Sequence, residues 1–254
     1  MKIGFVTFAR PDNYANIVRP GIVSKETYCM SNSYSLLQDV EDVFDSSRHP
    51  SWSKIRLLLK YMDKNSFDWL FWTDGDTLIK NQGKRLETLL AETSVQDNQD
   101  FVFTRDPRGT INLGNFFIRV TDDAKDFLNK LYQMDTFTSH PWHEQAALIW
   151  MYQRNKESIV GKSQIEHRPW KFNACPIQFH TKVSEAKRVP EIAVYRKGDF
   201  LVHFAGARDL CLQNWMLKYA DPDYKPLPPR DETNWQDFYR WRFGLTDLPE
   251  QKNT

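Results

Sequence analysis

The sequence predicts an α/β fold, with a mixed central sheet flanked by helices in a single Rossmann-like domain. Two observations lead to this prediction. Strand-like apolar runs alternate with helix-like periodicity through the first half of the chain. The apolar run at residues 68–72 then stops at Asp74-Gly75-Asp76, and ligands of open α/β sheets bind where strands end.

The first half reads as a strand, a helix and a second strand. Residues 3–8 form an apolar run of strand length that opens the fold. A helix is expected to start near Ser51, because its apolar residues recur at helical spacing: Trp52, Ile55, Leu58, Leu59 and Met62. Residues 68–72 follow as a strand whose continuous apolar character is typical of a strand covered on both faces.

The second half continues with strands at residues 101–104 and 111–120. Thr121 is predicted to cap a helix, with Asp122 and Asp123 in its first turn. A further helix is expected at residues 143–152, and residues 200–204 form a late strand that ends at Ala205-Gly206.

Composition limits the function classes. The chain has 254 residues, of which 41% are hydrophobic and 14% aromatic, as in a globular protein. Its 34 Lys and Arg against 33 Asp and Glu leave a net charge of +1, so no whole-protein field favours nucleic acid or an anionic membrane. No apolar run approaches the roughly 20 residues of a membrane span. Any anion site must therefore be local.

The cysteines and the first residues favour a cytoplasmic location. The N-terminal run has strand length and lacks the apolar region of a signal peptide. Cys29, Cys175 and Cys211 are far apart without metal-ligand spacing, and no Asn-x-Ser/Thr sequon occurs. We expect all three thiols to lie in the core.

Two Asp-x-Asp patterns occur, and their contexts differ. Asp74 and Asp76 follow a predicted buried strand, where two carboxylates can hold Mg²⁺ or Mn²⁺ against a diphosphate. Asp221 and Asp223 lie in a proline-rich stretch that reads as a surface turn. The first pair is the candidate site for a nucleotide-sugar, and a solvated turn that caps a helix is its structural alternative.

Five motifs occur in a defined order along residues 3–208. They are Trp52-x-Lys54, Trp72-x-Asp74-Gly75-Asp76, Asn112-Leu113-Gly114-Asn115-Phe116, Glu144-Gln145-Ala146-Ala147-Leu148 and Val202-His203-Phe204-Ala205-Gly206. Together they resemble glycosyltransferase family 34, the galactosyl/xylosyltransferase family of fungal Golgi α-galactosyltransferases and plant xyloglucan α-xylosyltransferases. The resemblance implies a GT-A fold, a UDP-linked donor, a saccharide acceptor and transfer with retention of anomeric configuration.

The resemblance also implies a metal site. Asp74, Asp76 and His203 would hold Mn²⁺, or Mg²⁺ in its place. A neutral imidazole suits Mn²⁺ beside carboxylates, and His203 ends a predicted strand on the same rim of the sheet. Its structural alternative is a histidine buried in the core.

The expected donor contacts come from strand ends and one helix start. The residues are Thr7, Phe8, Ala9, Trp52, Lys54, Asp74, Gly75 and Gly206. The end of the first strand is where an open α/β sheet receives a base and ribose. A lysine one turn into a helix can reach a diphosphate. The alternative for Trp52 is a residue of the helix's apolar stripe, and the alternative for Lys54 is a solvated helix residue.

Gln145, Glu144 and Asn112 are the candidate catalytic residues. Under the resemblance Asn112 contacts the sugar or acceptor, whereas it otherwise caps a turn. Gly114 predicts a bulge or a close approach of the backbone to a ligand. Plant members carry Asp-Asp-Gln where this chain has His143-Glu144-Gln145, which bears on sugar selectivity. We favour same-face attack with Glu144 and Gln145 positioning the sugar.

The domain prediction places a GT-A catalytic domain at residues 1–215. Its nucleotide-sugar half ends near residue 110, and its acceptor half spans 111–215. Residues 216–254 form an aromatic and proline-rich extension that packs on the domain, as a structural wrap or a lid. Two other functions stay open: a metal-dependent phosphodiesterase or pyrophosphatase acting on nucleotide-sugars, and a non-catalytic carbohydrate-binding module.

Overall fold

The computed structural model describes residues 1–10, 13–64, 66–106, 109–181, 190–232, 235–236 and 240. The strands are β1 (Ile3–Val6), β2 (Ser35–Leu37), β3 (Trp69–Thr73), β4 (Thr77–Ile79), β5 (Phe101–Arg105), β6 (Ile111–Arg119), β7 (Ser163–Glu166) and β8 (Leu201–His203). The helices are α1 (Asn13–Ile17), α2 (Arg19–Asn32), α3 (Ser53–Asp63), α4 (Leu86–Ala91), α5 (Asp122–Tyr132), α6 (His143–Gln153), α7 (Gln178–Thr181) and α8 (Asp209–Ala220).

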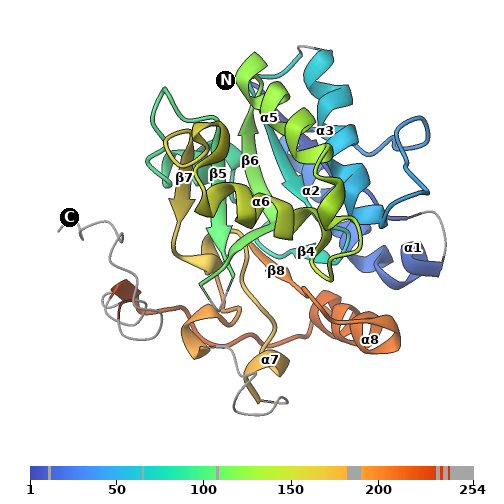
Figure 1. The fold of residues 1–254 in the computed structure, drawn as a ribbon. Coiled ribbons are helices and arrows are strands. Elements are labelled where there is room, and N and C mark those ends of the chain that lie inside the picture. The colour runs from blue at the N-terminus through green and yellow to red at the C-terminus, as the bar shows by residue number, and fades with distance from the viewer. Residues whose placement is uncertain are drawn as a thin grey trace.

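A six-stranded mixed sheet in the order β2-β1-β3-β6-β5-β7 forms the centre of the fold (Figure 1). The β1 strand runs parallel to β2 and β3, whereas β6 runs antiparallel to β3 and β5. A separate two-stranded sheet pairs β4 with β8. The prediction of an α/β fold with a mixed sheet flanked by helices is therefore confirmed.

Helices cover the sheet on both faces, which explains the uninterrupted apolar run in β3. Leu70 and Trp72 pack in one core cluster with side chains of α3, α5 and α6. Trp69 and Phe71 point to the other face, where they pack with α2 and α4. Because successive strand residues alternate between faces, both sets must be apolar when both faces are buried.

The strand pairings bring the predicted site residues to one edge of the sheet. The parallel strands β1 and β3 end side by side, and the chain turns at Asp74-Gly75-Asp76 into β4. In the antiparallel β4–β8 pair, Thr77 lies opposite His203. This pairing places a histidine from the late part of the chain beside Asp76.

Several local predictions are confirmed. The helix predicted to start near Ser51 comprises a 3₁₀ turn at Pro50–Trp52 followed by α3. The Thr121 hydroxyl accepts a hydrogen bond from the Ala124 amide and caps α5. The first strand is shorter than predicted and ends at Val6. Around Asp221, the Tyr224 amide donates to the Asp221 carbonyl, which makes the expected surface turn.

Other predictions need correction. The Cys211 side chain is exposed, whereas Cys29 and Cys175 are buried as expected. Helix α8 gives Cys211 its position, because its buried face is carried by Leu212, Met216 and Tyr219. The boundary predicted at residue 215 falls inside α8, which runs from Asp209 to Ala220. The division into a catalytic domain and an extension stays a prediction.

The structure describes part of the predicted C-terminal extension, including Trp235. Trp235 is buried and packs edge to face on Trp170, with ring centroids 6.4 Å apart. The aromatic residues at 238, 239, 241 and 243 lie outside the described residues.

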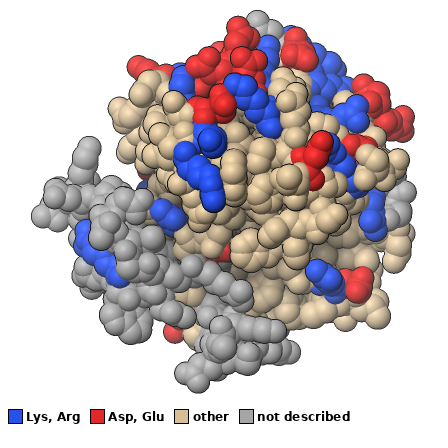
Figure 2. All heavy atoms as spheres, in the orientation of Figure 1, with Lys and Arg blue, Asp and Glu red and all other residues tan. Residues whose placement is uncertain are grey.

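The distribution of surface charge and the length of the helices relate to the prediction that the chain binds neither nucleic acid nor a membrane. On the face seen in Figure 2, blue and red side chains of the described residues are interspersed, with uncharged surface between them. No helix in the described ranges is long and apolar enough to cross a bilayer. The cytoplasmic location stays a prediction.

Candidate functional site

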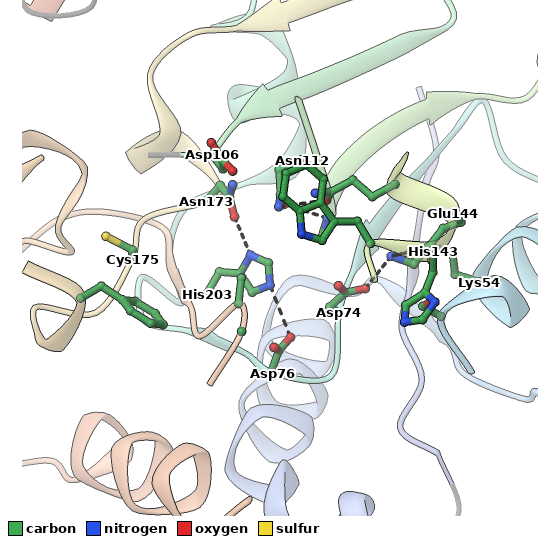
Figure 3. Close-up of a pocket in the computed structure, with 17 residues that line it drawn as sticks. Lys54, Asp74, Asp76, Asp106, Asn112, His143, Glu144, Asn173, Cys175 and His203 are labelled. Atoms are coloured by element: carbon green, nitrogen blue, oxygen red, sulfur yellow. Dashed lines mark hydrogen bonds and ion pairs between the residues drawn. The ribbon is translucent and has the colours of Figure 1, made fainter. Parts of the chain in front are cut away.

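Asp74, Asp76 and His203 come together at the edge of the sheet. One ligand atom from each of them lies within 4.8 Å of the other two. His203 Nε2 is 3.4 Å from Asp76 Oδ1, and both side chains point into the same space (Figure 3). Two carboxylates and an imidazole at this separation match the hard and borderline ligands of Mn²⁺ or Mg²⁺.

Asn173 fixes the orientation of the His203 ring. Its Oδ1 lies 2.6 Å from His203 Nδ1 and 3.3 Å from Asn115 Nδ2. Because a carboxamide oxygen only accepts, Nδ1 must carry a proton. The Nε2 atom then faces Asp76 across 3.4 Å, and a proton or a metal ion between them removes the repulsion of two lone pairs. His203 is buried, as the core alternative expects, and its Nε2 is also placed where it could bind a metal ion together with Asp76.

Gly114 leaves room for His203. A Cβ at this position would lie 2.1 Å from His203 Cε1 and 2.9 Å from Asn112 Oδ1. The pairing of β5 and β6 shifts register between the pairs Phe103–Phe116 and Thr104–Asn112, the stretch of β6 that contains Gly114, so the predicted bulge is confirmed. The group that approaches the Gly114 backbone closely is the imidazole of His203, whereas the sequence prediction had allowed for a ligand there.

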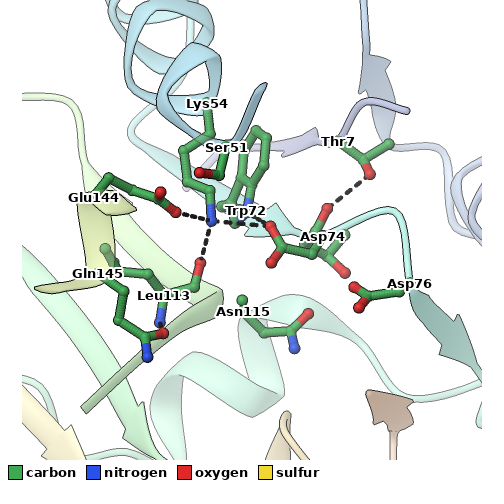
Figure 4. A network of polar contacts seen from close by, with 12 residues as sticks. Thr7, Ser51, Lys54, Trp72, Asp74, Asp76, Leu113, Asn115, Glu144 and Gln145 are labelled. Carbon is green, nitrogen blue, oxygen red and sulfur yellow. Dashed lines mark hydrogen bonds and ion pairs between the residues drawn. The ribbon is translucent and has the colours of Figure 1, made fainter. Parts of the chain in front are cut away.

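Lys54 is buried between two carboxylates (Figure 4). Its Nζ lies 3.0 Å from Asp74 Oδ1 and 3.0 Å from Glu144 Oε1, and it donates to the Leu113 carbonyl at 2.9 Å. Burial acts to lower the pKa of Lys54, but Asp74 and Glu144 outweigh it and raise the pKa above its ordinary value. The alternative of a solvated lysine is wrong.

The two aspartates differ electrostatically. Burial raises the pKa of Asp74, although Lys54 opposes this effect. For Asp76 burial acts in the same direction, but His203 outweighs it and lowers the pKa. Trp72 Nε1 donates to Asp74 Oδ1 at 2.8 Å, so this oxygen already has two partners and Oδ2 is the atom left for a metal.

Helix α2 supports the Asp-Gly-Asp turn from behind. The fully buried Lys25 donates from Nζ to the carbonyls of Asp74, at 2.7 Å, and Gly75, at 3.2 Å. Burial lowers the pKa of Lys25 to about 7. One turn earlier, Gly21 packs so closely that a Cβ would lie 2.7 Å from the Gly75 carbonyl. The turn is therefore held at its backbone as well as through its carboxylates.

Two cavities meet at the carboxylates. The β6-side cavity, about 470 Å³, is lined by Asp74 and Asp76 together with Lys54, Asn112, Glu144, Gln145, His203 and Gly206. The β1-side cavity, about 310 Å³, is lined by Phe8, Arg10, Tyr14, His49, Pro50, Ser51, Asp74, Gly75 and Asp76. Ser51, Asp74 and Asp76 belong to both.

Gln145 and Asn112 interact at the wall of the β6-side cavity. Gln145 Oε1 accepts from Asn112 Nδ2 at 3.2 Å and from the Leu113 amide at 3.1 Å. Asn112 Oδ1 accepts from the Gly114 amide at 2.8 Å, so it also caps the bulge. Both readings of Asn112 from the sequence are thus compatible with its position.

Three of the residues predicted to contact the donor, Thr7, Ala9 and Trp52, are not among the residues that line either cavity. Trp52 is fully buried in the core and lines neither cavity. The Thr7 hydroxyl is buried and donates to the Thr73 carbonyl at 2.7 Å. Ala9 packs beside the cluster that contains Leu78 and Phe204. Each lies near the site, where it supports neighbouring backbone or core.

Sequence reasoning missed Asn173, Asp106 and Trp142. All three line the β6-side cavity. Asn173 lies in an irregular segment and reaches His203 because Ala174 bridges to Val202 of β8. No local pattern marks such a residue. Asp106 directly follows β5, so the strand-end argument applied to Asp74 could have found it.

The start of α6 has an unusual backbone. His143 has φ 44°, in the left-handed region, and its ring stacks on His49 with centroids 3.7 Å apart and planes at 5°. Left-handed backbone at a non-glycine residue costs of order 1 kcal/mol and often occurs at functional sites. Contacts such as the stacking on His49 must therefore hold the strained helix start that carries Glu144 and Gln145.

Comparison with known sequences supports the resemblance drawn from the motifs. A sequence model of the galactosyl transferase GMA12/MNN10 family, glycosyltransferase family 34, matches residues 91–211. The matched segment includes the motifs at 112–116, 144–148 and 202–206. The chain is also 24% identical over 179 residues to the probable alpha-1,6-mannosyltransferase MNN10 of Saccharomyces cerevisiae, covering 59% of this chain and 42% of that protein. The chain thus spans less than half the length of this relative.

Solved structures share the fold. A glycosyltransferase involved in the glycosylation of the major capsid of PBCV-1 superimposes with a TM-score of 0.64, at 16% identity over 85% of this chain and all of that one. Glycosyltransferase GlyE of Streptococcus pneumoniae gives 0.52, at 13% identity over 88% of this chain and 62% of that one. Mouse xyloside xylosyltransferase 1 gives 0.51, at 8% identity over 81% and 98%. The fold is the GT-A fold.

Proposed function

We propose that this chain, a GT-A protein by its fold, is a retaining glycosyltransferase. It moves a hexose or pentose from a UDP-sugar to a saccharide acceptor, with Mn²⁺, or Mg²⁺ in its place, held by Asp74, Asp76 and His203. The resemblance to glycosyltransferase family 34 supports the reaction class.

The observation that carries the proposal is the junction of the two cavities at Asp74 and Asp76. A diphosphate bound through a metal at these carboxylates leaves the nucleoside in the β1-side cavity and the sugar in the β6-side cavity. Phe8 and Tyr14 line the nucleoside side, where aromatic rings suit a base. A single donor molecule thereby accounts for both cavities.

Glu144 offers a polar group for the sugar. Its side chain is 5% exposed, and Oε1 is paired with Lys54. Among the described residues Oε2 has no hydrogen-bond partner, although it is buried. Buried oxygens are almost always hydrogen-bonded, so a donor hydroxyl in the β6-side cavity would complete this one. Gln145, on the same helix turn, adds a rigidly held amide.

The chemistry requires stabilisation of the leaving diphosphate and of an oxocarbenium-like sugar. A bound divalent metal would supply charge for the diphosphate. Lys54 Nζ lies 3.0 Å from Asp74 and 3.0 Å from Glu144 and holds the two carboxylates side by side, so one can serve the metal and the other the sugar. Same-face attack needs no carboxylate nucleophile, which suits a Glu144 that is already committed to Lys54.

Titration of UDP in the presence of Mn²⁺ and in EDTA tests the metal bridge. UDP should bind tightly only with the metal, because a bare diphosphate is repelled by Asp74 and Asp76. Asp76→Asn should abolish the metal dependence, whereas Asp223→Asn, in the exposed turn, should bind like the unmodified chain. Equal UDP affinity in EDTA would sink the metal-bridge model.

Product analysis tests the reaction class. Incubation of UDP-sugars with Mn²⁺ and saccharides should release UDP together with a glycoside that NMR identifies as α-linked from an α-linked donor. A phosphodiesterase would yield UMP and sugar phosphate, and a carbohydrate-binding module would yield no product. A β-linked first product would contradict retention.

A further inference from the structure

Trp142 is an aromatic side chain left exposed beside the cavity. It is 56% exposed and lines the β6-side cavity. The other large apolar side chains exposed in the described part of the chain are aliphatic, namely Met1, Val23, Met30, Val160, Leu210 and Leu217. An indole exposes much apolar surface to water, and such surface at the rim of a cavity marks a binding position.

Trp142 is held at a fixed position relative to the site. Its carbonyl accepts from the amides of Gln145, at 3.0 Å, and Ala146, at 3.2 Å, which ties it to the first turn of α6. Its amide donates to His140 Nδ1 at 3.0 Å, and the two rings meet edge to face. The backbone of Trp142 is therefore held in place and its indole rests against His140, which reduces the entropy lost when a ligand stacks on it.

The exposure of Trp142 places it outside the donor position. The donor sugar must lie near Glu144, which is 4% exposed, and next to the metal carboxylates. Trp142 directly precedes α6 and lies exposed at the rim of the β6-side cavity. A molecule that enters this cavity after the donor therefore contacts Trp142. In a transferase that molecule is the acceptor.

The charges of the cavity define the class of acceptor. Asp74, Asp76, Asp106 and Glu144 line it, against the single lysine Lys54 of its described lining. With four carboxylates and one lysine, this described lining disfavours an anionic sugar. Neutral pyranosides carry an apolar C–H face for an indole and hydroxyls for Asp106 and Asn112.

We propose that Trp142 is the acceptor platform of this chain, on which the C–H face of a neutral pyranoside stacks. The inference rests on the proposed function and makes it more specific. It gives the acceptor a contact that is separate from the metal, the diphosphate and the donor sugar.

Saturation-transfer NMR with methyl α-D-mannopyranoside and methyl α-D-galactopyranoside tests the platform without turnover. At least one of the two should receive saturation from the unmodified chain, strongest on its ring C–H protons, and the signal should drop at least about threefold in Trp142→Ala. Trp142→Phe should retain most of it. Methyl β-D-glucuronide should bind more weakly than the neutral probes. Trp142→Ala should fold, since the side chain is more than half exposed.

Kinetics with the donor found by UDP release give the second measurement. Trp142→Ala should raise the KM for the neutral acceptor about tenfold, while the affinity for UDP with Mn²⁺ stays within about twofold. Leu210→Ala, which removes another exposed apolar side chain far along the chain, should leave both unchanged. An unchanged saturation signal and acceptor KM in Trp142→Ala would overturn the platform.

Other outcomes separate the two proposals. Loss of UDP affinity in Trp142→Ala would assign the indole to the donor and overturn the inference, although a transferase would remain. UDP binding with no saturation of either neutral probe by the unmodified chain would also overturn it. Saturation that depends on Trp142 in a chain that binds no UDP would retain Trp142 as a pyranoside contact, but would refute the transferase and with it the acceptor role.

Discussion

Replacing Lys54 by methionine tests whether the buried cation stabilises the site. The Lys54 side chain is 4% exposed, and its ammonium lies 3.0 Å from one oxygen of Asp74 and 3.0 Å from one of Glu144. Methionine preserves most of the apolar stem but leaves two carboxylates without their counter-ion. Loss of one partner from a buried ion pair costs roughly 3–5 kcal/mol. For a chain of this size that corresponds to a fall in Tm of roughly 6–20 °C.

Lys60→Met is the matched control. Lys60 lies on the same helix and also contacts two carboxylates, Asp39 and Asp42, but those partners are 64% and 65% exposed. Exposed ion pairs contribute less than about 1 kcal/mol, so the Tm should change by only a few degrees. The comparison isolates burial, since residue type, helix and number of partners are the same.

Thermal unfolding followed by circular dichroism in EDTA is the assay, because bound metal would add its own stabilisation. Equal changes in Tm for Lys54→Met and Lys60→Met would refute the reasoning. Adding Glu144→Gln to Lys54→Met should restore part of the lost stability, since it removes one unpaired carboxylate. No recovery in the double variant would attribute the loss to packing instead of charge.

Two further predictions concern the histidines. Gly114→Ala should displace the His203 ring, because the new Cβ would lie 2.1 Å from Cε1, and titration should show that the affinity for Mn²⁺ falls at least about tenfold. The control Gly161→Ala meets only an ordinary 3.7 Å contact and should bind Mn²⁺ normally. Normal Mn²⁺ affinity in Gly114→Ala would contradict the proposed packing of His203 on Gly114. Burial and the neighbouring His143 lower the pKa of His49 below its ordinary 6.5. The folded chain then binds fewer protons than the unfolded chain just below pH 6.5, so the stability present above that pH is lost as the pH falls through the lowered pKa. His49→Phe keeps a stacking ring and should flatten this loss in denaturant titrations between about pH 7.5 and about pH 5, and an unchanged slope would exclude His49 as its source.

The sequence determined the elements that depend on local pattern. The apolar run of β3 and its end before Asp74 follow from burial on both faces, and the cap at Thr121 follows from hydrogen bonding within four residues. The strand-end argument also found the carboxylates of the candidate metal site, because an Asp-x-Asp after a buried strand is carried to the edge of the sheet by that strand alone.

The sequence did not determine what surrounds those carboxylates. The sequence offered Lys54 as a donor contact or, alternatively, as a solvated helix residue, and only the packing of α3 beside β6 and α6 makes it a buried counter-ion to Asp74 and Glu144. Trp52, which the motif offered as a donor contact, is fully buried in the core by the same packing. Periodicity marks which face of a helix is buried but not what the neighbouring element presents to it.

His203 and Asn173 show the same division at longer range. The strand at the end of which His203 lies could be predicted, but its partner could not, and only the pairing of β4 with β8 sets the imidazole 3.4 Å from Asp76. Asn173, which fixes the protonated nitrogen, comes from an irregular segment bridged to β8. Pairing between segments more than a hundred residues apart depends on the packing of the whole core, so the tertiary structure alone decided how Asp74, Asp76 and His203 meet.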